Sequence, residues 1–285
     1  MVLTFIVSCK SKQIDYVDYY NKTLAIDSIL RYQKDTLTAI KKYKKHFKKY
    51  GIQNQERLRE FEIYALLCHK KNKDFGGKKA LLTLIGLIEP YKERYKDLSF
   101  FNKYGLDSLA IVEKYKLTQS SYNKILIDSF KIARLRDQSS QKGGNTNTNK
   151  IANLNNMQLF KWSFAKYGFP STKKVGSLGV WYDSSFYELL FMNLFKYPEG
   201  YNYLQENLKP YIKSGECNPY SYAVLVDRYY TLTKKNESYY SVLKTFNDLS
   251  HADSLLINKH RKEIGLPQMS HSRLIPTDRL QILKL

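Results

Sequence analysis

The chain has 285 residues, more than one typical domain needs, which predicts two helical units. Lys and Arg total 47 against 26 Asp and Glu, giving a formal net charge of +21. Such basicity fits nucleic-acid or anionic-membrane partners, but the 25 Tyr and the many Lys, Asn and Ile also follow from AT-rich codons, so it assigns no ligand. Three cysteines and five histidines without ligand spacing exclude a disulfide framework and a zinc site, so we expect no metal and no cofactor.

The first nine residues, MVLTFIVSC, form an apolar run that ends in a cysteine. This run resembles the lipobox at which bacterial signal peptidase II cuts before a lipidated cysteine, which would be Cys9. It is short for a secretory signal and lacks a basic n-region, and we attribute this to a start codon placed too far downstream. A buried strand or disordered end is the alternative. We expect residues 1–20 to be signal and tether.

The SCKSK sequence that follows the run is similar to the lipoproteins of Bacteroidetes-type bacteria. The resemblance implies a lipid-anchored protein of the cell envelope, on the periplasmic face of the outer membrane. No other segment reaches the ~18 apolar residues of a membrane span, so the lipid would be the only anchor. Expected partners are the membrane and a protein or anionic envelope component.

Residues 21–117 carry helical periodicity and are expected to form a helical-hairpin domain. Apolar residues recur from Leu24 to Tyr50, which predicts one helix ended by Gly51. Asn54 and Asp74 can cap a second and a third helix, and Pro90 bends or ends the third. The run YALLCHKKNKDFGGKKALLTLI resembles the small-residue hairpin of tetratricopeptide-type repeats, although no 34-residue period is visible.

The lysines of Lys41–Lys49, KKYKKHFKK, occupy the surface left by Tyr43 and Phe47 on an amphipathic helix. A solvated face is the default interpretation of such a run. An anionic phospholipid or polysaccharide surface is the sharper one. Nucleic acid is less favoured because no aromatic RNA-stacking motif accompanies the lysines.

Residues 118–270 are expected to form a compact helical domain, followed by a tail at 271–285. Thr118 begins a helix that closes near residue 138, and the polar, Gly-rich segment 139–150 predicts a mobile loop. Helical patterning resumes at Leu154–Tyr167 and again at Ser184–Phe195. Asn218 followed by Pro219 predicts a helix start.

The Pro219 helix carries an acid and a base after an uninterrupted apolar turn. Asp227 and Arg228 point about 100° apart on a helix, so each needs a separate partner. Because Asp227 lies on the same face as Ala223, we expect its carboxylate to be buried and paired. Arg134 and Arg136 are the expected partners, since a guanidinium can hold a carboxylate with two hydrogen bonds.

About Tyr122–Gln268, seven landmarks occur in the order of a bacterial domain family of unknown function, which the segment resembles. They are Arg136-Asp137-Gln138, Asn153 or Asn155, Gly168-Phe169-Pro170-Ser171, Val175-Gly176, Gly215-Glu216, Tyr222-Ala223-x-Leu225-x-Asp227-Arg228, and Arg261-Lys262-Glu263-Ile264-Gly265-Leu266-Pro267. This chain has Met192-Asn193-Leu194 where the family has Gln-His-Ala, and Tyr239-Tyr240-Ser241-Val242 where the family has Tyr-Gly-Thr-Gln. The family carries no activity to transfer.

The polar landmarks are expected to converge on one network or pocket. They are Arg136, Asp137, Gln138, Asn193, Glu216, Asp227 and Arg228. A sealed network would stabilise the helices, and an open pocket would suit a small anionic or sugar-like ligand. We expect an all-α, non-catalytic binding module of the envelope. The alternatives are a hydrolase-like enzyme, impaired because Asn193 cannot act as a general base, and a cytosolic nucleic-acid-binding protein.

Overall fold

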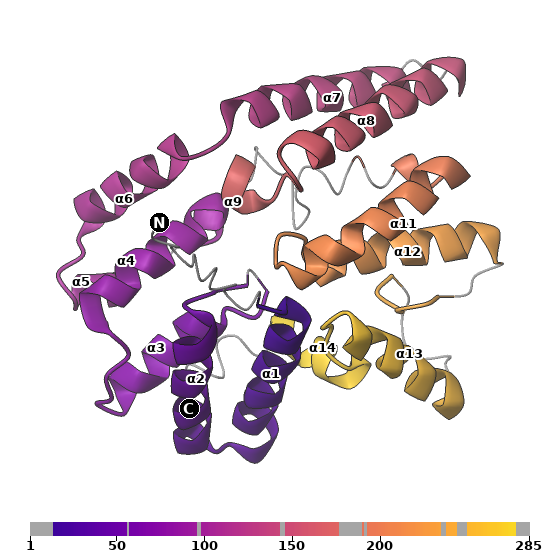
Figure 1. The fold of residues 1–285 in the computed structure, drawn as a ribbon. Helices are drawn as coiled ribbons and strands as arrows, with labels where there is room; N and C mark the ends of the chain where they lie inside the picture. Colours follow the sequence, from indigo (N-terminus) through magenta and orange to yellow (C-terminus); the bar gives the residue numbers. More distant parts are fainter. Residues whose placement is uncertain are drawn as a thin grey trace, which may run out of the picture.

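A computed structural model describes residues 14–55, 57–95, 98–142, 146–176, 190, 193–234, 238–243 and 250–277. Within these ranges every regular element is a helix and no strand occurs, which confirms the all-α class (Figure 1). Cys9 and most of the expected Ser184–Phe195 helix lie outside the described residues. No described helix combines the length and apolarity needed to cross a membrane.

The helices of the first half lie along the left and lower sides of Figure 1. They are α1 (Tyr16–Ser28), a π-helical turn (Ile29–Gln33), α2 (Thr36–Tyr50), α3 (Glu60–Lys70), α4 (Gly77–Ile88), a 3-10 turn (Glu89–Arg94), α5 (Ser99–Asn102) and α6 (Ser108–Ser120). The expected single helix from Leu24 to Tyr50 is wrong. Lys34 has a left-handed φ of 56°, which ends the π-turn, and the Asp35 side chain caps α2 by accepting from the Thr38 N–H at 2.9 Å.

The helices of the second half lie along the top and right of Figure 1. They are α7 (Lys124–Lys142), α8 (Thr146–Lys166), α9 (Thr172–Val175), α11 (Pro198–Lys213), α12 (Pro219–Thr233), α13 (His251–Glu263) and α14 (Met269–Thr277). The α12 start at Pro219 is as expected, and the Asn218 side chain accepts from the Tyr220 N–H at 2.9 Å. The expected helix start at Thr118 is wrong, because α6 continues through it to Ser120.

The predicted mobile loop at 139–150 is wrong for its described residues, since 139–142 continue α7 and 146–150 begin α8, while 143–145 lie outside the described residues. Tertiary packing overrides the polar composition of 139–142 and 146–150. Phe130 of α7 and Phe160 of α8 are fully buried against each other, with ring centroids 5.2 Å apart. The two helices form a long hairpin whose packing extends the helices into the polar segment.

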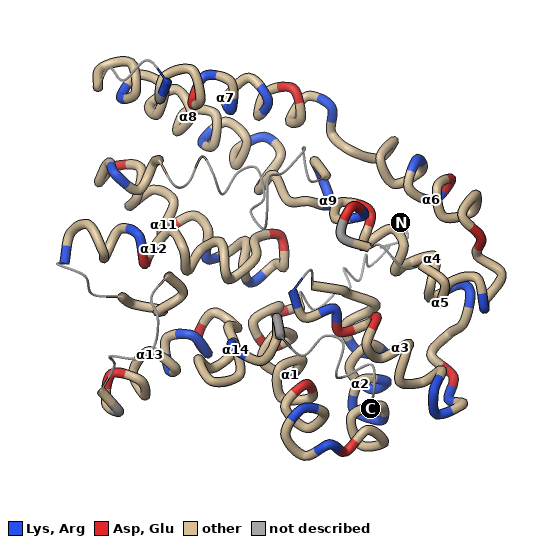
Figure 2. The backbone as a smooth tube through the Cα atoms, turned by 180° about the vertical axis from the view of Figure 1, so that it is seen from behind, with Lys and Arg blue, Asp and Glu red and all other residues tan. Residues whose placement is uncertain are grey.

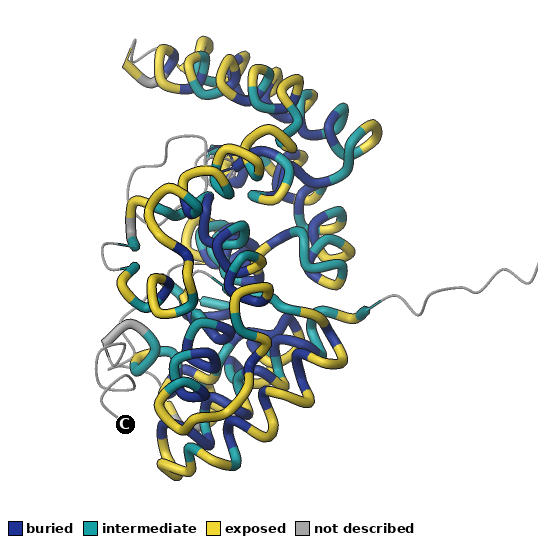
Figure 3. The backbone as a smooth tube through the Cα atoms, turned by 90° about the vertical axis from the view of Figure 1, so that its left-hand side faces the viewer, coloured by how far each residue is buried: buried dark blue, intermediate teal, exposed yellow. Residues whose placement is uncertain are grey.

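The buried apolar side chains form two clusters that largely follow the two halves. Figure 3 shows buried and exposed positions alternating along the helices. The first contains residues between Ile26 and Ile111. The second lies among α7, α8, α11 and α12, and it also takes in Tyr19 and Tyr20 of α1. Because α1 contributes to both clusters, it joins the halves.

Two glycine landmarks let the second half approach α1 closely. Gly215 has a φ of 75°, and a Cβ there would lie 2.5 Å from the Tyr16 ring. Gly265 has a φ of 80°, and a Cβ there would lie 2.7 Å from Tyr20. Neither position accommodates a side chain in space or in backbone conformation. The glycines at these two positions therefore have a structural reason that involves no ligand.

A second junction fixes α14 to the end of α1. Asp27 is fully buried, and one of its carboxylate oxygens accepts from Arg31 Nε at 2.5 Å and contacts His271 Nε2 at 2.7 Å. The other ring nitrogen of His271 lies 2.9 Å from Ser28 Oγ. The chain thus returns from α14 to its first helix, and Figure 1 shows α14 beside α1.

Candidate functional site

Asp227 is fully buried, as expected, but its partners are different from those expected. One carboxylate oxygen accepts from the backbone N–H groups of Tyr239 and Tyr240 at 2.8 and 2.7 Å, and the other accepts from Val242 at 2.7 Å. Arg134 and Arg136 are therefore wrong as its partners. Ser241 has a left-handed φ of 51°, so the segment curls around the carboxylate and directs its N–H groups inward.

Arg261 holds the other side of this curled segment. It is 1% exposed, and its guanidinium donates to the carbonyl of Tyr240 at 2.8 Å and to that of Pro267 at 2.5 Å. Burial lowers the pKa of Arg261 to about 10, and the charge of Asp227 opposes that shift. Asp227 and Arg261 therefore hold residues 239–242 between them, which is a structural role.

Asp137 and Asn193 are brought together, as expected for two members of the polar set. Asn193 Nδ2 donates to a carboxylate oxygen of the buried Asp137 at 2.7 Å. Arg136 contacts a different helix, donating to Asn156 on α8 at 3.1 Å. Gln138 is exposed. The expected set is thus divided, with Asp137 and Asn193 in one contact and Asp227 in another.

Glu216 and Arg228, the last two members of the set, make no hydrogen bond to the Asp227 carboxylate in the described part of the chain. Glu216 follows α11, and its carboxylate accepts from Lys174 Nζ at 2.6 Å. Lys174 also donates to the carbonyl of Tyr167 at 2.8 Å, so the Gly168 and Glu216 landmarks meet through this lysine. Arg228 is partly buried, and its Nε has no hydrogen-bond partner among the described residues.

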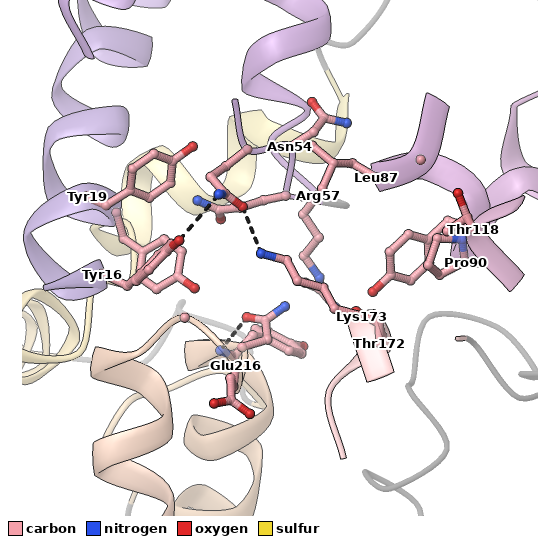
Figure 4. A pocket seen from close by; sticks show the side chains of 18 of the residues that line it. Tyr16, Tyr19, Asn54, Arg57, Leu87, Pro90, Thr118, Thr172, Lys173 and Glu216 are labelled. Atoms are coloured by element: carbon pink, nitrogen blue, oxygen red, sulfur yellow. Dashed lines mark hydrogen bonds between the residues drawn. The ribbon is translucent and has the colours of Figure 1, made fainter. Parts of the chain in front are cut away.

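A cavity of about 210 Å³ lies where the two halves meet, and Glu216 is the only member of the predicted set among its lining residues (Figure 4). Four segments far apart in sequence form its wall. They are the start of α1, residues 53–55 and 57 before α3, residues 172–173 of α9, and residues 215–220, which lead from the end of α11 into the first turn of α12. The ends of α4 and α6 complete it.

Polar side chains cross the cavity and join its walls. Lys173 Nζ donates to Gln53 Oε1 at 3.1 Å, and Gln53 Nε2 donates to the Tyr16 hydroxyl at 3.3 Å (Figure 4). The Arg57 guanidinium lies 3.6 Å from the centre of the Tyr220 ring. The Lys173–Gln53 and Arg57–Tyr220 contacts connect the second half to the first.

Three donors in this wall have capacity to spare. Gln55 Nε2 is buried and has no hydrogen-bond partner among the described residues. Arg57 is exposed with its guanidinium on a ring face, and Lys173 donates to one neutral amide. A buried amide without a partner costs about 1–3 kcal/mol, so this donor needs a structural or ligand-based reason.

The electrostatics of the wall favour a negative group. Loss of hydration lowers the pKa of Lys173 below its ordinary value, and the charge of Glu216 opposes this shift. The carboxylate of Glu216 itself is neutralised by Lys174, and Glu89 is held by Tyr122 and Gln119. The carboxylates of Glu216 and Glu89 therefore have hydrogen-bond partners within the protein, whereas Arg57 and Lys173 retain donors that a ligand could use.

A buried acid lies behind the same wall. Glu60 is fully buried, accepts from the Tyr19 hydroxyl at 2.6 Å, and accepts from the Gln55 N–H at 2.9 Å. Burial raises the pKa of Glu60 to about 7, and the Tyr19 hydrogen bond opposes the shift. Tyr19 and Gln55, which both donate hydrogen bonds to Glu60, also line the cavity. Glu60 therefore lies directly behind the residues of the cavity wall.

Sequence reasoning missed most of this wall, including Gln53, Gln55, Arg57 and Lys173. The signal that could have found the wall is the cluster Gln53-Asn54-Gln55, in which three neutral amides precede Arg57 by two residues. The sequence pattern instead predicts a helix cap at Asn54 and helix in the residues after it. The structure shows that α3 begins only at Glu60, which leaves these amides on an irregular segment that faces the cavity.

Comparisons with models of known families, with curated proteins and with solved structures find no match. The resemblance to a bacterial family of unknown function therefore stays a prediction. Among the described residues, no group of three or more His, Cys, Asp or Glu side chains is placed to hold a metal ion. The function of the cavity is therefore inferred from the positions and contacts of its lining residues alone.

Proposed function

We propose that the protein is a non-catalytic binding module whose ligand occupies the cavity between the two halves. The observation that carries the proposal is the pair of cations in the cavity wall, Arg57 and Lys173, which contact a ring face and a neutral amide and have no carboxylate partner within 4 Å among the described residues. An oxygen-rich anionic group would accept hydrogen bonds from both cations.

The rest of the wall favours a small ligand that carries a ring as well as the charge. Six tyrosines line the cavity together with the amides, and a volume of about 210 Å³ suits a single small molecule. Ring faces provide flat apolar contact, and neighbouring amides and hydroxyls provide hydrogen bonds to a polyhydroxylated ring. An acidic sugar or a sugar phosphate combines both features.

Isothermal titration calorimetry with galacturonate, glucose 6-phosphate and glucose tests the proposal. We expect an anionic sugar to bind and neutral glucose to bind at least tenfold more weakly. Arg57→Met with Lys173→Met should reduce the affinity at least tenfold, since each charged contact contributes about 1.5–3 kcal/mol. Lys209→Met with Lys213→Met, which removes two exposed lysines of α11, is the matched control and should bind normally. Equal affinity for the three sugars, or loss of binding in the control, would contradict the proposal.

We also propose, from the lipobox-like sequence at Ile6–Cys9, that the protein is anchored to the cell envelope by a lipid on Cys9. Cys9→Ala should then move the protein from the membrane fraction to the soluble fraction. If Cys9→Ala leaves the fractionation unchanged, the proposal of a lipid anchor on Cys9 is wrong. The ligand proposal does not depend on this result, because the cavity lies in the folded helices.

A hydrolase-like activity is the second candidate, and the contact between Asp137 and Asn193 is the observation in its favour. The Asp227 carboxylate, its other expected member, accepts three backbone hydrogen bonds elsewhere. Both of its oxygens are engaged and the side chain is fully buried, so the carboxylate does not face a substrate. Restoring the family histidine with Asn193→His and assaying hydrolysis of glycoside and ester substrates would test this candidate.

A further inference from the structure

Helix α2 presents an outer face made of lysines. The helix has the sequence TLTAIKKYKKHFKKY, with six lysines and no acid. Its inner face is buried through Tyr43, Phe47 and Tyr50, and all six lysines are exposed. At 100° per residue, Leu37, Lys41, Lys44, Lys45 and Lys48 fall within one sector of the outer surface. We call these five residues the α2 basic face.

The charges of this face are not neutralised by the rest of the fold. Lys49, at its edge, contacts Asp18 at 3.5 Å. For Lys41, Lys44, Lys45 and Lys48, no carboxylate lies within 4 Å among the residues that the structure describes. Lys44 also lies near Cys68 at the end of α3, where further exposed lysines follow (Figure 2).

The face also carries one exposed apolar side chain, Leu37, which is 60% exposed at the start of α2. Lysines beside exposed apolar residues are typical of helices that lie on a membrane surface, where the lysines meet lipid phosphates and the apolar groups enter the acyl boundary. Binding to the phosphates of a nucleic acid would not bury the Leu37 side chain, whereas insertion at a membrane surface would.

We propose that the α2 basic face binds the surface of a bilayer that contains anionic lipids. The start of the described chain supports this occupant. Asp18 of α1 contacts Lys49, so α1 begins beside the end of α2. Cys9 is five residues before Ile14, a span of at most about 18 Å. A lipid on Cys9 and the α2 basic face would therefore reach the same membrane, and one acyl chain alone gives only marginal binding.

The full chain carrying Cys9→Ala tests the face without the lipid. Co-sedimentation with vesicles of phosphatidylcholine alone, and of phosphatidylcholine with 30% phosphatidylglycerol, measures binding in low salt. We expect binding to the anionic vesicles only, and at least a tenfold loss with Lys41→Glu, Lys44→Glu and Lys48→Glu together. Leu37→Ser should weaken binding at least threefold. Circular dichroism checks that each variant is folded.

Lys209→Glu, Lys213→Glu and Lys234→Glu make the same change in net charge on exposed lysines of α11 and the end of α12. This control should retain anionic-vesicle binding within about twofold. An equal loss in the control would show that net charge alone is responsible and overturn the proposal. So would binding to single-stranded RNA without binding to anionic vesicles, which would favour a nucleic-acid partner. The cavity ligand can fail its own test without affecting either outcome.

Discussion

The Asp227 network and the cavity between the halves differ in how completely their polar groups are hydrogen-bonded. Around Asp227, both carboxylate oxygens are used by backbone N–H groups, and Arg261 donates to the carbonyls of the same segment. In the cavity, Gln55 Nε2 is buried without a described partner, and Arg57 lies against a ring face. A network that only stabilises the fold satisfies its members, and a binding site keeps donors for its ligand.

This comparison also explains why polar landmarks in a sequence are poor guides to a ligand site. The position of Asp227 after an apolar turn predicts a buried, paired carboxylate, and the structure confirms the burial. The role of the carboxylate, however, is to hold residues 239–242. The residues that line the cavity lie on an irregular segment whose polarity resembles that of any loop.

The largest effect is expected from Asp227→Ala. Removing the carboxylate leaves three buried N–H groups without an acceptor and leaves Arg261 without its nearby negative charge. We expect the free energy of unfolding to fall by about 3–5 kcal/mol. Urea melts measure it, with Asp227→Asn as a milder variant that keeps one acceptor oxygen.

In contrast, Gln55→Leu should leave the free energy of unfolding at the parent value or raise it by up to about 3 kcal/mol, since it removes an amide whose Nε2 is buried without a hydrogen-bond partner among the described residues. If Asp227→Ala melts like the parent protein, or if Gln55→Leu costs as much as Asp227→Ala, the contrast between the two regions is lost.

A smaller effect concerns Glu60, behind the cavity wall. Its pKa of about 7 lies above the ordinary value of 4.5, so the folded state holds a proton that the unfolded state has released between these pH values. The free energy of unfolding should therefore fall as pH rises from about 4.5 to about 7, by on the order of 2–3 kcal/mol.

His46 acts in the opposite direction, because burial lowers its pKa to about 4 and the unfolded state takes up the proton first. Its contribution rises with pH up to about 6.5, which partly masks Glu60 in the parent protein. Glu60→Gln isolates the acid. Urea melts at pH 5, 6 and 7 should show a stability that falls less, or rises more, with pH in the variant than in the parent. Parallel pH profiles would show that Glu60 is ionised throughout.

The smallest effect is expected on the outer surface of α2. Neutralising Lys41, Lys44 and Lys48 to Gln should leave the free energy of unfolding within about 0.5 kcal/mol of the parent value, because exposed lysines without carboxylate partners contribute little. Denaturant melts in low salt provide the measurement. A cooperative loss of folding would mean that these lysines support the fold, and the vesicle experiment would then need the Lys→Arg variants.

The sequence was a good guide to what local patterns determine. The all-α class, the Asn218 cap and the burial of Asp227 follow from periodicity, capping chemistry and the apolar turn before the carboxylate. It failed where distant packing decides. The hairpin of α7 and α8 extends into a segment with the composition of a loop, and Lys34 divides one amphipathic pattern into two helices. The cavity was missed because its walls come from four distant segments.

The most direct test of the central claim is an NMR titration of uniformly ¹⁵N-labelled protein with glucose 6-phosphate and galacturonate, following side-chain amide resonances. Gln55 Nε2 reports the unsatisfied cavity, and Asn193 Nδ2, which donates to Asp137 at 2.7 Å, reports a satisfied contact. We predict that the Gln55 resonances shift with saturation on addition of an anionic sugar while those of Asn193 stay in place. A Gln55 signal that does not move, or shifts of equal size at Gln55 and Asn193, would contradict the account.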